Sequence, residues 1–127
     1  NNVIDGNVIT GKTNVFNAGI DFASKSSAAS CDNNIVRNNI SSDGSTRGFW
    51  QWGAGSGNTI GPNNTFNNNL LYGVLFGFEN ESNPLGTKNL IFNNTMLGNG
   101  ICDITDQGNM VNNIYKNNNF VCFSSTP

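Results

Sequence analysis

The chain has 127 residues, enough for one domain, and its charge is sparse: 11% of the residues are charged, the net charge is −2 and His is absent. Six scattered Lys and Arg residues do not form the basic stripe of a nucleic-acid-binding domain, so we expect no nucleic-acid partner. Nine Phe residues and 36% hydrophobic content argue against a disordered chain, and no apolar run reaches the ~20 residues that span a membrane. The sequence therefore predicts one folded domain over 1–127 without membrane insertion.

One eight-residue pattern recurs five times along the chain. Its copies are NVIDGNVI (2–9), NNIVRNNI (33–40), TIGPNNTF (59–66), NLIFNNTM (89–96) and NIYKNNNF (113–120). The eighth position is apolar in every copy and the second position in four, and we expect both columns to face the core. In the second copy Asn34 breaks the second column, and a one-residue shift would replace it by Ile35. The sixth position is Asn in every copy: Asn7, Asn38, Asn64, Asn94 and Asn118.

A second motif lies between the copies and consists of Gly, an apolar residue and a short alternating run. It appears as GIDF (19–22), GFWQW (48–52), GVLF (73–76) and GICDI (100–104). Alternation is typical of a strand, whose successive side chains face opposite sides. We expect an inward column of Ile20, Phe49, Val74 and Ile101. The residues that follow them would form an outward column of Asp21, Trp50, Leu75 and Cys102.

Two motifs that recur in a fixed order, 24 to 31 residues apart, indicate a repeat architecture. The density of Asn, Gly and Ser opposes the helices of ankyrin and tetratricopeptide repeats, and the Leu framework of leucine-rich repeats is absent. We therefore predict a β-solenoid, whose coils each add a strand to two or three parallel sheets at about 4.8 Å per coil.

The recurring Asn has a physical interpretation in such a fold. Asn tolerates the left-handed backbone conformation of a sharp turn, and its amide can both donate to and accept from the Asn of neighbouring coils. The five sixth-position Asn residues are therefore predicted to form a structural ladder. Because Asn does not titrate, they are poor candidates for acid–base catalysis.

The repeated N-x-I-x-x-N-x-[I/F/M] followed by G-[I/V/F]-x-[F/I] resembles the repeat of the pectate-lyase-like superfamily over almost the whole chain (2–123). The resemblance implies an all-β, right-handed parallel β-helix of four to five coils. That superfamily includes polysaccharide lyases, glycoside hydrolases, carbohydrate epimerases, phage tailspikes and periplasmic NosD-type proteins. The resemblance thus implies an extracellular or cell-surface protein with a polysaccharide or glycan partner, although no member's catalytic motif can be placed on this chain.

In such a fold, function usually lies on the outward positions of one sheet and on the loops beside it. The segment RGFWQWGAG (47–55) places Trp50 and Trp52 on one outward face, where exposed aromatic faces stack on sugar rings and Arg47 can hold a carboxylate. The alternative is that one or both Trp residues pack under a loop or at an interface. The candidate carbohydrate-binding residues are Asp21, Arg47, Trp50, Trp52, Tyr72 and Glu79.

The acidic residues give little support for catalysis. Uronate lyases of this superfamily resemble one another in using clustered carboxylates for Ca²⁺ and a Lys or Arg base, but the eight acidic residues here are dispersed. Asp21 and Asp103 would lie three coils apart, roughly 14 Å, too far to act on one glycosidic bond. Asp103 and Asp106 offer too few oxygen ligands for calcium, and the lack of His removes the usual zinc ligand and nucleophile-activating base. We predict no metal site and no cofactor, with Ca²⁺ left open.

Three Cys residues allow one disulfide and leave one thiol over. Cys102 and Cys122 could pair across neighbouring coils, although one alignment of the last coil puts them out of register; Cys31 lies in an insertion and would be free. Sequons for N-glycosylation carry little weight in a chain so rich in Asn, and they occur at Asn39, Asn63, Asn80 and Asn93.

Three functional hypotheses remain open from the sequence. The first is a polysaccharide-binding extracellular module in which catalysis is not evident. The second is a structural protein whose uncapped coils stack or trimerise into a fibre or spike, and the third is an intact lyase or glycoside hydrolase. Because the chain starts inside one repeat copy and stops soon after another, we expect 1–127 to belong to a longer solenoid or to be covered by partner chains.

Overall fold

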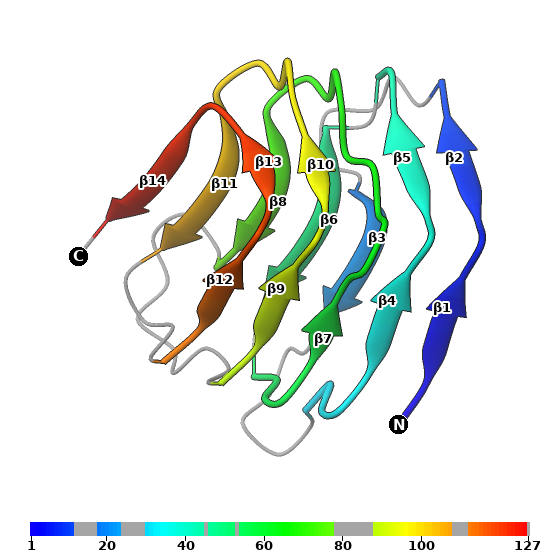
Figure 1. Cartoon of the computed structure of the whole chain (residues 1–127), viewed down its shortest axis with the longest axis vertical. Coiled ribbons are helices and arrows are strands. Elements are labelled where there is room, and N and C mark those ends of the chain that lie inside the picture. Colours follow the sequence, from blue (N-terminus) through cyan, green and yellow to red (C-terminus); the bar gives the residue numbers. More distant parts are fainter. Residues whose placement is uncertain are drawn as a thin grey trace.

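The computed structural model describes residues 1–11, 18–23, 30–44, 46–52, 54–77, 88–107 and 112–126. These residues form fourteen short strands and no helix (Figure 1). In chain order the strands are β1 (Val3–Asp5), β2 (Val8–Thr10), β3 (Ala18–Ala23), β4 (Ile35–Arg37), β5 (Ile40–Ser42), β6 (Arg47–Trp52), β7 (Thr59–Ile60), β8 (Tyr72–Phe76), β9 (Leu90–Phe92), β10 (Thr95–Met96), β11 (Cys102–Gln107), β12 (Ile114–Lys116), β13 (Asn119–Phe120) and β14 (Phe123–Thr126). The all-β prediction is confirmed.

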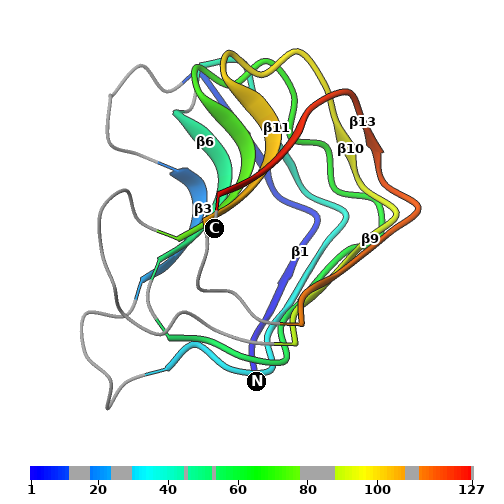
Figure 2. The same cartoon turned by 90° about the vertical axis from the view of Figure 1, so that its left-hand side faces the viewer.

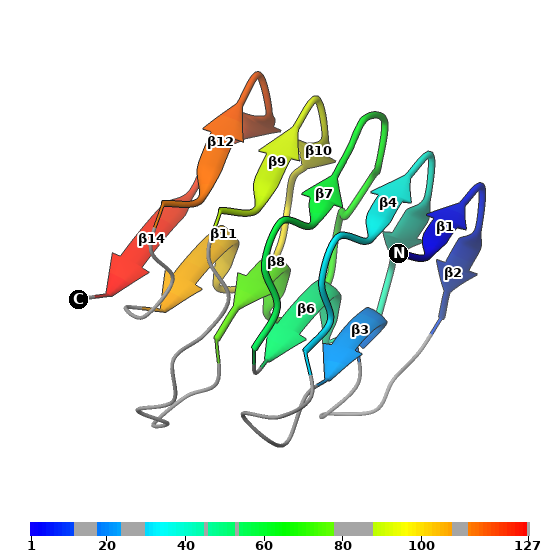
Figure 3. The same cartoon turned by 90° about the horizontal axis from the view of Figure 1, so that it is seen from below.

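The strands form three parallel sheets that the chain visits in turn. Sheet 1 has the order β1-β4-β7-β9-β12, and sheet 3 has the order β3-β6-β8-β11-β14. Sheet 2 consists of the strand pairs β2-β5 and β10-β13. Parallel β-bridges made by Thr65 connect the two pairs. We call one passage of the chain through sheets 1, 2 and 3 a level, so that strands of successive levels pair with each other. Viewed along the stack, the levels superpose on three sides (Figure 2), and the sequence runs steadily from one edge of the stack to the other (Figure 3).

The Asn ladder is present at the corner between sheets 1 and 2. In each of the first four ladder residues, the backbone N–H donates to the side-chain oxygen of the Asn one level on, at 2.9–3.2 Å. Each side-chain N–H also donates to that oxygen, so the backbone and side-chain amides of successive levels are linked. The ladder residues are Asn7, Asn39, Asn64, Asn94 and Asn118.

The prediction of Asn38 as a ladder member is wrong. Asn38 is exposed and has φ 54°, whereas Asn39 is fully buried in the ladder. The sheet register pairs Ile35 with Val3, so the second repeat copy is shifted by one residue and its ladder Asn is the next one. Asn38 instead makes the left-handed turn that precedes the ladder position, as Asn63, Asn93 and Asn117 do in later levels.

The core column of sheet 1 differs from the predicted one by one position in every level except the third, where Ile60 is buried as predicted. Val3 and Ile114, in the second position of the pattern, are 56% and 58% exposed. In the first, fourth and fifth copies the third position points inward instead, because strand alternation places it on the opposite face. In the second copy the inward residue is Val36, one position beyond the predicted Ile35, and in the third copy the predicted second-position residue Ile60 is inward. The inward column is Ile4, Val36, Ile60, Ile91 and Tyr115. In the eighth-position column, Ile40 is also exposed, and Ser41 takes the place paired with Ile9.

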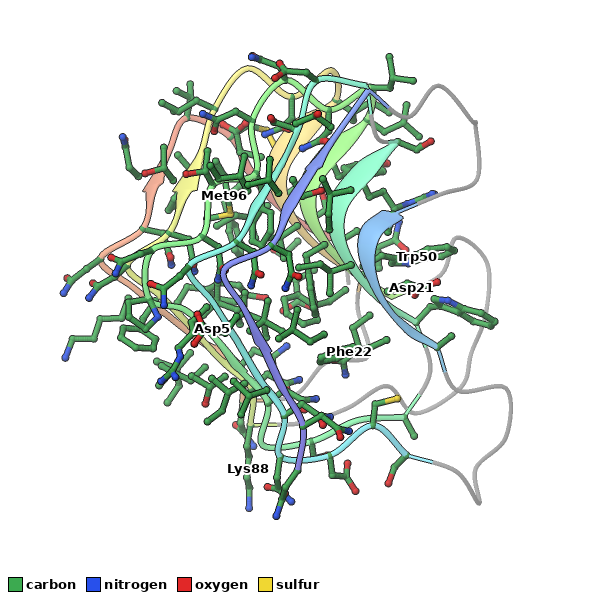
Figure 4. The ribbon with its side chains drawn as sticks, turned by 90° about the vertical axis from the view of Figure 1, so that its right-hand side faces the viewer. Asp5, Asp21, Phe22, Trp50, Lys88 and Met96 are labelled. Carbon is green, nitrogen blue, oxygen red and sulfur yellow. A yellow bond between two sulfur atoms is a disulfide. The ribbon has the colours of Figure 1, made fainter. Side chains whose placement is uncertain are left out.

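Aromatic rings fill the space between the sheets. The ring of Phe49 lies 5.2 Å from that of Phe22, 5.8 Å from that of Phe76 and 6.4 Å from that of Phe66, measured between centroids. Phe22 and Met96 lie inside the stack, as Figure 4 shows. Complete burial of one such side chain stabilises the fold by about 1.5–3 kcal/mol, so this row supplies much of the driving force for stacking.

The Gly of the second motif is required where adjacent levels approach closely. A Cβ at Gly48 would lie 2.6 Å from the backbone oxygen of Gly73, and one at Gly73 would lie 2.6 Å from that of Asp103. No side chain fits between backbones at this distance. The motif therefore marks the entry to sheet 3, directly before the inward residues Phe49 and Val74.

Candidate functional site

The predicted site residues gather on the outer face of sheet 3, where β3, β6 and β8 lie side by side. Strand pairing sets Asp21 beside Trp50, and Arg47 beside Tyr72. Trp52 follows on the same face of β6 because it is two residues beyond Trp50. Asp21 and Trp50 lie on the side of the sheet that faces away from Phe22 and Met96 (Figure 4). Glu79, the sixth candidate, lies outside the described residues.

Trp50 and Trp52 form a stacked pair. Their ring centroids are 5.6 Å apart and the ring planes are inclined by 29°. The indole N–H of Trp50 donates to the backbone oxygen of Gly77 at 2.8 Å. Trp50 is only 6% exposed, whereas Trp52 is half-buried. The outward direction of both rings is thus as expected, but Trp50 is a packed residue and Trp52 is the more accessible one.

Arg47 lies within this aromatic cluster. Its guanidinium carbon is 4.2 Å from the centroid of the Trp50 ring and 6.0 Å from that of Tyr72. Arg47 is 7% exposed and Tyr72 is 6% exposed. A cation held over an aromatic face away from water stabilises by roughly 2 kcal/mol, so Arg47 has a structural role in holding Trp50 in place.

Asp21 brings a carboxylate to the open side of the Trp pair. Partial burial raises the pKa of Asp21 above its usual value, while a hydrogen bond from Trp52 and the charge of Arg47 act in the opposite direction. The side chain is exposed, so it is accessible from solution. Trp52 and Asp21 place an aromatic ring beside a hydrogen-bond acceptor. A sugar ring can stack on such an aromatic ring while one of its hydroxyls donates to the acceptor.

The outer face of sheet 3 also carries an apolar cluster of its own. Trp50, Tyr72, Leu75 and Cys102 are buried there, and Cys102 forms a disulfide with Cys122. Cys31 is a free thiol, half-buried.

In β11, the fourth strand of sheet 3, the predicted inward and outward positions are wrong. Ile101 is 58% exposed, and the inward residue paired with Val74 is Ile104. The outward residue paired with Leu75 is Thr105 instead of Cys102, which pairs with Tyr72. Counting from the ladder position would have located the inward residue, because Val74 and Ile104 each follow Asn69 and Asn99 by five residues.

Asp103 and Asp106 make contacts that hold the last level of the stack. One carboxylate oxygen of Asp103 accepts the backbone N–H groups of Val121 and Cys122, at 2.9 and 3.2 Å. Asp106 accepts the hydroxyl of Tyr115 at 2.6 Å, and burial is the largest cause of a strongly raised pKa of Tyr115. Within the described ranges, no three His, Cys, Asp or Glu side chains gather as a metal site would need.

Two further Asn ladders escaped the sequence prediction. One lies at the corner between sheets 3 and 1 and consists of Asn2, Asn34, Asn58, Asn89 and Asn113. The other, between sheets 2 and 3, links Asn69 to Asn99, whose amide donates to Asp103 at 2.8 Å. The sequence signal that could have found them is an Asn-Asn or Gly-Asn pair, as in Asn33–Asn34 and Gly57–Asn58. In the structure the first residue of each pair has a positive φ and the second is the ladder Asn.

Comparison with known proteins found no match: no family model, no curated protein and no solved structure matches the chain. In the part of the chain that the structure describes, no helix is long and apolar enough to cross a membrane.

Proposed function

We propose that the stack is a right-handed parallel β-helix of four to five coils, similar to those of the pectate-lyase-like superfamily. Three observations support this proposal: the parallel pairing in all three sheets, the single direction in which the chain visits them, and the ladders at their corners. The Cys102–Cys122 disulfide is compatible with an oxidising extracellular location and supports that part of the proposal.

The function that the geometry supports best is binding of a polysaccharide on the outer face of β3 and β6. The observation that carries it is the stacked pair: buried Trp50 packs against the half-buried Trp52, which lies beside the partly buried carboxylate of Asp21. A ring fixed in this way loses little conformational entropy on binding. The alternative that an intact lyase or hydrolase resides in this chain is less favoured, because Asp103 and Asp106 are engaged by Cys122 and Tyr115.

A glycan-binding screen with the Trp52→Ala variant tests this proposal. We expect at least a tenfold loss of affinity for any glycan bound by the unchanged chain, equivalent to about 1.4 kcal/mol. Phe92→Ala is the matched control, because Phe92 is a half-buried aromatic residue on sheet 1. Equal binding by the unchanged and Trp52→Ala chains, both folded by circular dichroism, would refute the site. Turnover of a uronate polysaccharide would favour the enzyme alternative.

A further inference from the structure

The surface beside Trp52 is built from β3 and from residues 30–32. Asp21 accepts a hydrogen bond from Trp52, and strand pairing places the small, exposed Ala23 next to Trp52 on the same face. The thiol of Cys31 donates to the backbone oxygen of Ala23 at 3.7 Å, which brings residues 30–32 to this end of β3. A ligand that stacks on Trp52 therefore also meets the side chains of this segment.

Asp32 adds a second carboxylate near the end of β3. Burial, followed by the charges of Asp32 and Asp21, raises the pKa of the Cys31 thiol, so both carboxylates lie within electrostatic reach of this thiol. Asp32 accepts the hydroxyl of Ser30 and, at 2.7 Å, the backbone N–H of Ser56. These two hydrogen bonds lower the pKa of Asp32 and favour its ionised form. The side of the stack that carries Trp52 thus holds two carboxylates.

The basic residues of the described ranges do not offer a positive charge to a ligand at this place. Arg47 is buried, with its guanidinium carbon 4.2 Å from the centroid of the Trp50 ring. Its charge lowers the pKa of Asp21 against the larger, raising effect of burial, and so favours the ionised carboxylate. Lys88 and Asp21 lie on different sides of the stack (Figure 4). The other described basic residues belong to β4 and β12 of sheet 1 and are Arg37 and Lys116.

On the basis of the carbohydrate site proposed above, we infer that the sugar that contacts Trp52 is neutral and that uronic acid polymers are rejected. A neutral sugar stacks on the ring and donates a hydroxyl to the carboxylate of Asp21, which only accepts hydrogen bonds when it is ionised. A uronate in the same place brings its own carboxylate against Asp21 and Asp32. Like charges a few ångströms apart repel, and partial burial strengthens the repulsion. Asp21 is therefore a specificity-determining residue.

The first test is a binding screen with matched glycans. Its probes are neutral hexose oligosaccharides and the same oligosaccharides with their C6 hydroxyls oxidised to carboxylates. Among the probes whose binding is lost in Trp52→Ala, the neutral member of each pair should bind at least about tenfold more tightly. Equal or tighter binding of the oxidised members would overturn the inference and leave the carbohydrate site in place. If no probe depends on Trp52, the carbohydrate site itself is refuted, and the inference with it.

The second test removes one charge from the site. Asp21→Asn keeps an acceptor for Trp52, so the ratio of neutral to oxidised affinity should fall by at least about threefold, whatever happens to either affinity alone. Asp5→Asn is the matched control, because Asp5 is an exposed carboxylate on sheet 1 and its removal should leave the ratio unchanged. An unchanged ratio in a folded Asp21→Asn chain, or an equal fall in both variants, contradicts the role of Asp21.

The third test uses the unchanged chain and therefore does not depend on the folding of a variant. Salt screens the repulsion between charges that are accessible to solvent. Raising the NaCl concentration from about 20 mM to about 500 mM should therefore strengthen binding of an oxidised probe relative to its neutral partner. A ratio that does not change with salt, or that moves in the opposite direction, would show that charge does not select the ligand and would overturn the inference.

Discussion

The side-chain oxygen of Asn64 accepts both the backbone N–H and the side-chain N–H of Asn39, 25 residues earlier in the chain, at 3.0 and 3.1 Å. The side-chain amide of Asn64 in turn donates to the backbone oxygen of Val36 and to the side-chain oxygen of Asn94. Because Asn64 is 1% exposed, each of these bonds replaces a lost contact with water. The ladder thus satisfies buried polar groups at a corner where regular sheet pairing is interrupted.

Replacement of Asn64 by Asp should destabilise the fold strongly. The carboxylate that Asn64→Asp introduces would keep the acceptor but lose both donors, and it would place a buried charge against the oxygens of Val36 and Asn94. We expect a loss of about 3 kcal/mol or more in the free energy of unfolding, measured with urea at neutral pH. The matched control is Asn93→Asp, which changes the exposed residue before the next ladder position and should alter stability by less than about 0.5 kcal/mol. Equal effects at the two positions would contradict the ladder's role.

At the residue before the ladder position, the effect of a substitution on stability should depend on whether the new residue tolerates a positive φ, and not on the chemistry of its side chain. Asn93 has φ 51° and is exposed. Asn93→Val should cost about 1–2 kcal/mol, because a β-branched side chain is strained in the left-handed region. Asn93→Gly should be close to neutral, because Gly adopts this conformation freely. Urea unfolding of both variants checks this, and a Val variant as stable as the Gly variant would contradict it.

The repeat period, the all-β fold and four of five predicted ladder members could be obtained from the sequence because they recur. The sequence does not distinguish Asn38 from Asn39, because the two roles at a corner are filled by the same amino acid. Only backbone conformation distinguishes the left-handed turn residue from the buried amide. The corner doublet, and not the single Asn, is the unit that repeats.

The packing of the candidate site could not be predicted in the same way. Alternation placed Trp50 and Trp52 on one face, but the burial of Trp50 depends on Arg47, Tyr72 and Leu75, which come from two different levels. In the fourth strand of sheet 3, the motif that begins at Gly100 predicts Ile101 in the core, but Ile101 is exposed and Ile104 is buried. The ladder residue Asn99 sets the register of this strand, because the inward residue Ile104 lies five residues after it.

The disulfide should contribute to stability through the last level of the stack. Cys102 and Cys122 are 20 residues apart, and closing a loop of this length stabilises by about 3 kcal/mol in the loop-entropy model. The double Ser variant should lose about this amount and should show faster hydrogen exchange in β14. Cys31→Ser should change stability little, because this thiol is unpaired, and should preserve the response to reductant. Loss of the reductant response in Cys31→Ser would contradict the pairing.

Asp21 and Asp5 should have opposite effects on the pH dependence of stability. Burial raises the pKa of Asp21 from the usual 3.8, so its folded form binds the proton more tightly than the unfolded form does. Its contribution favours folding at low pH and is lost as the pH rises from 3.8 through the raised value. Hydrogen bonds from Asn38 and Arg37 lower the pKa of Asp5, so its contribution is present above 3.8 and is lost as the pH falls through the lowered value.

Asp21→Asn should therefore increase stability at pH 7 relative to the unchanged chain, because it removes the unfavourable partly buried charge while keeping an acceptor for the hydrogen bond from Trp52. Asp5→Asn should decrease stability at pH 7, and this difference should be smaller at pH 2, because the contribution of the carboxylate is lost as the pH falls from 3.8 through the lowered pKa. Urea unfolding of the three chains at both pH values measures the two differences. If both substitutions shift stability in the same direction at pH 7, burial is not the dominant influence on Asp21.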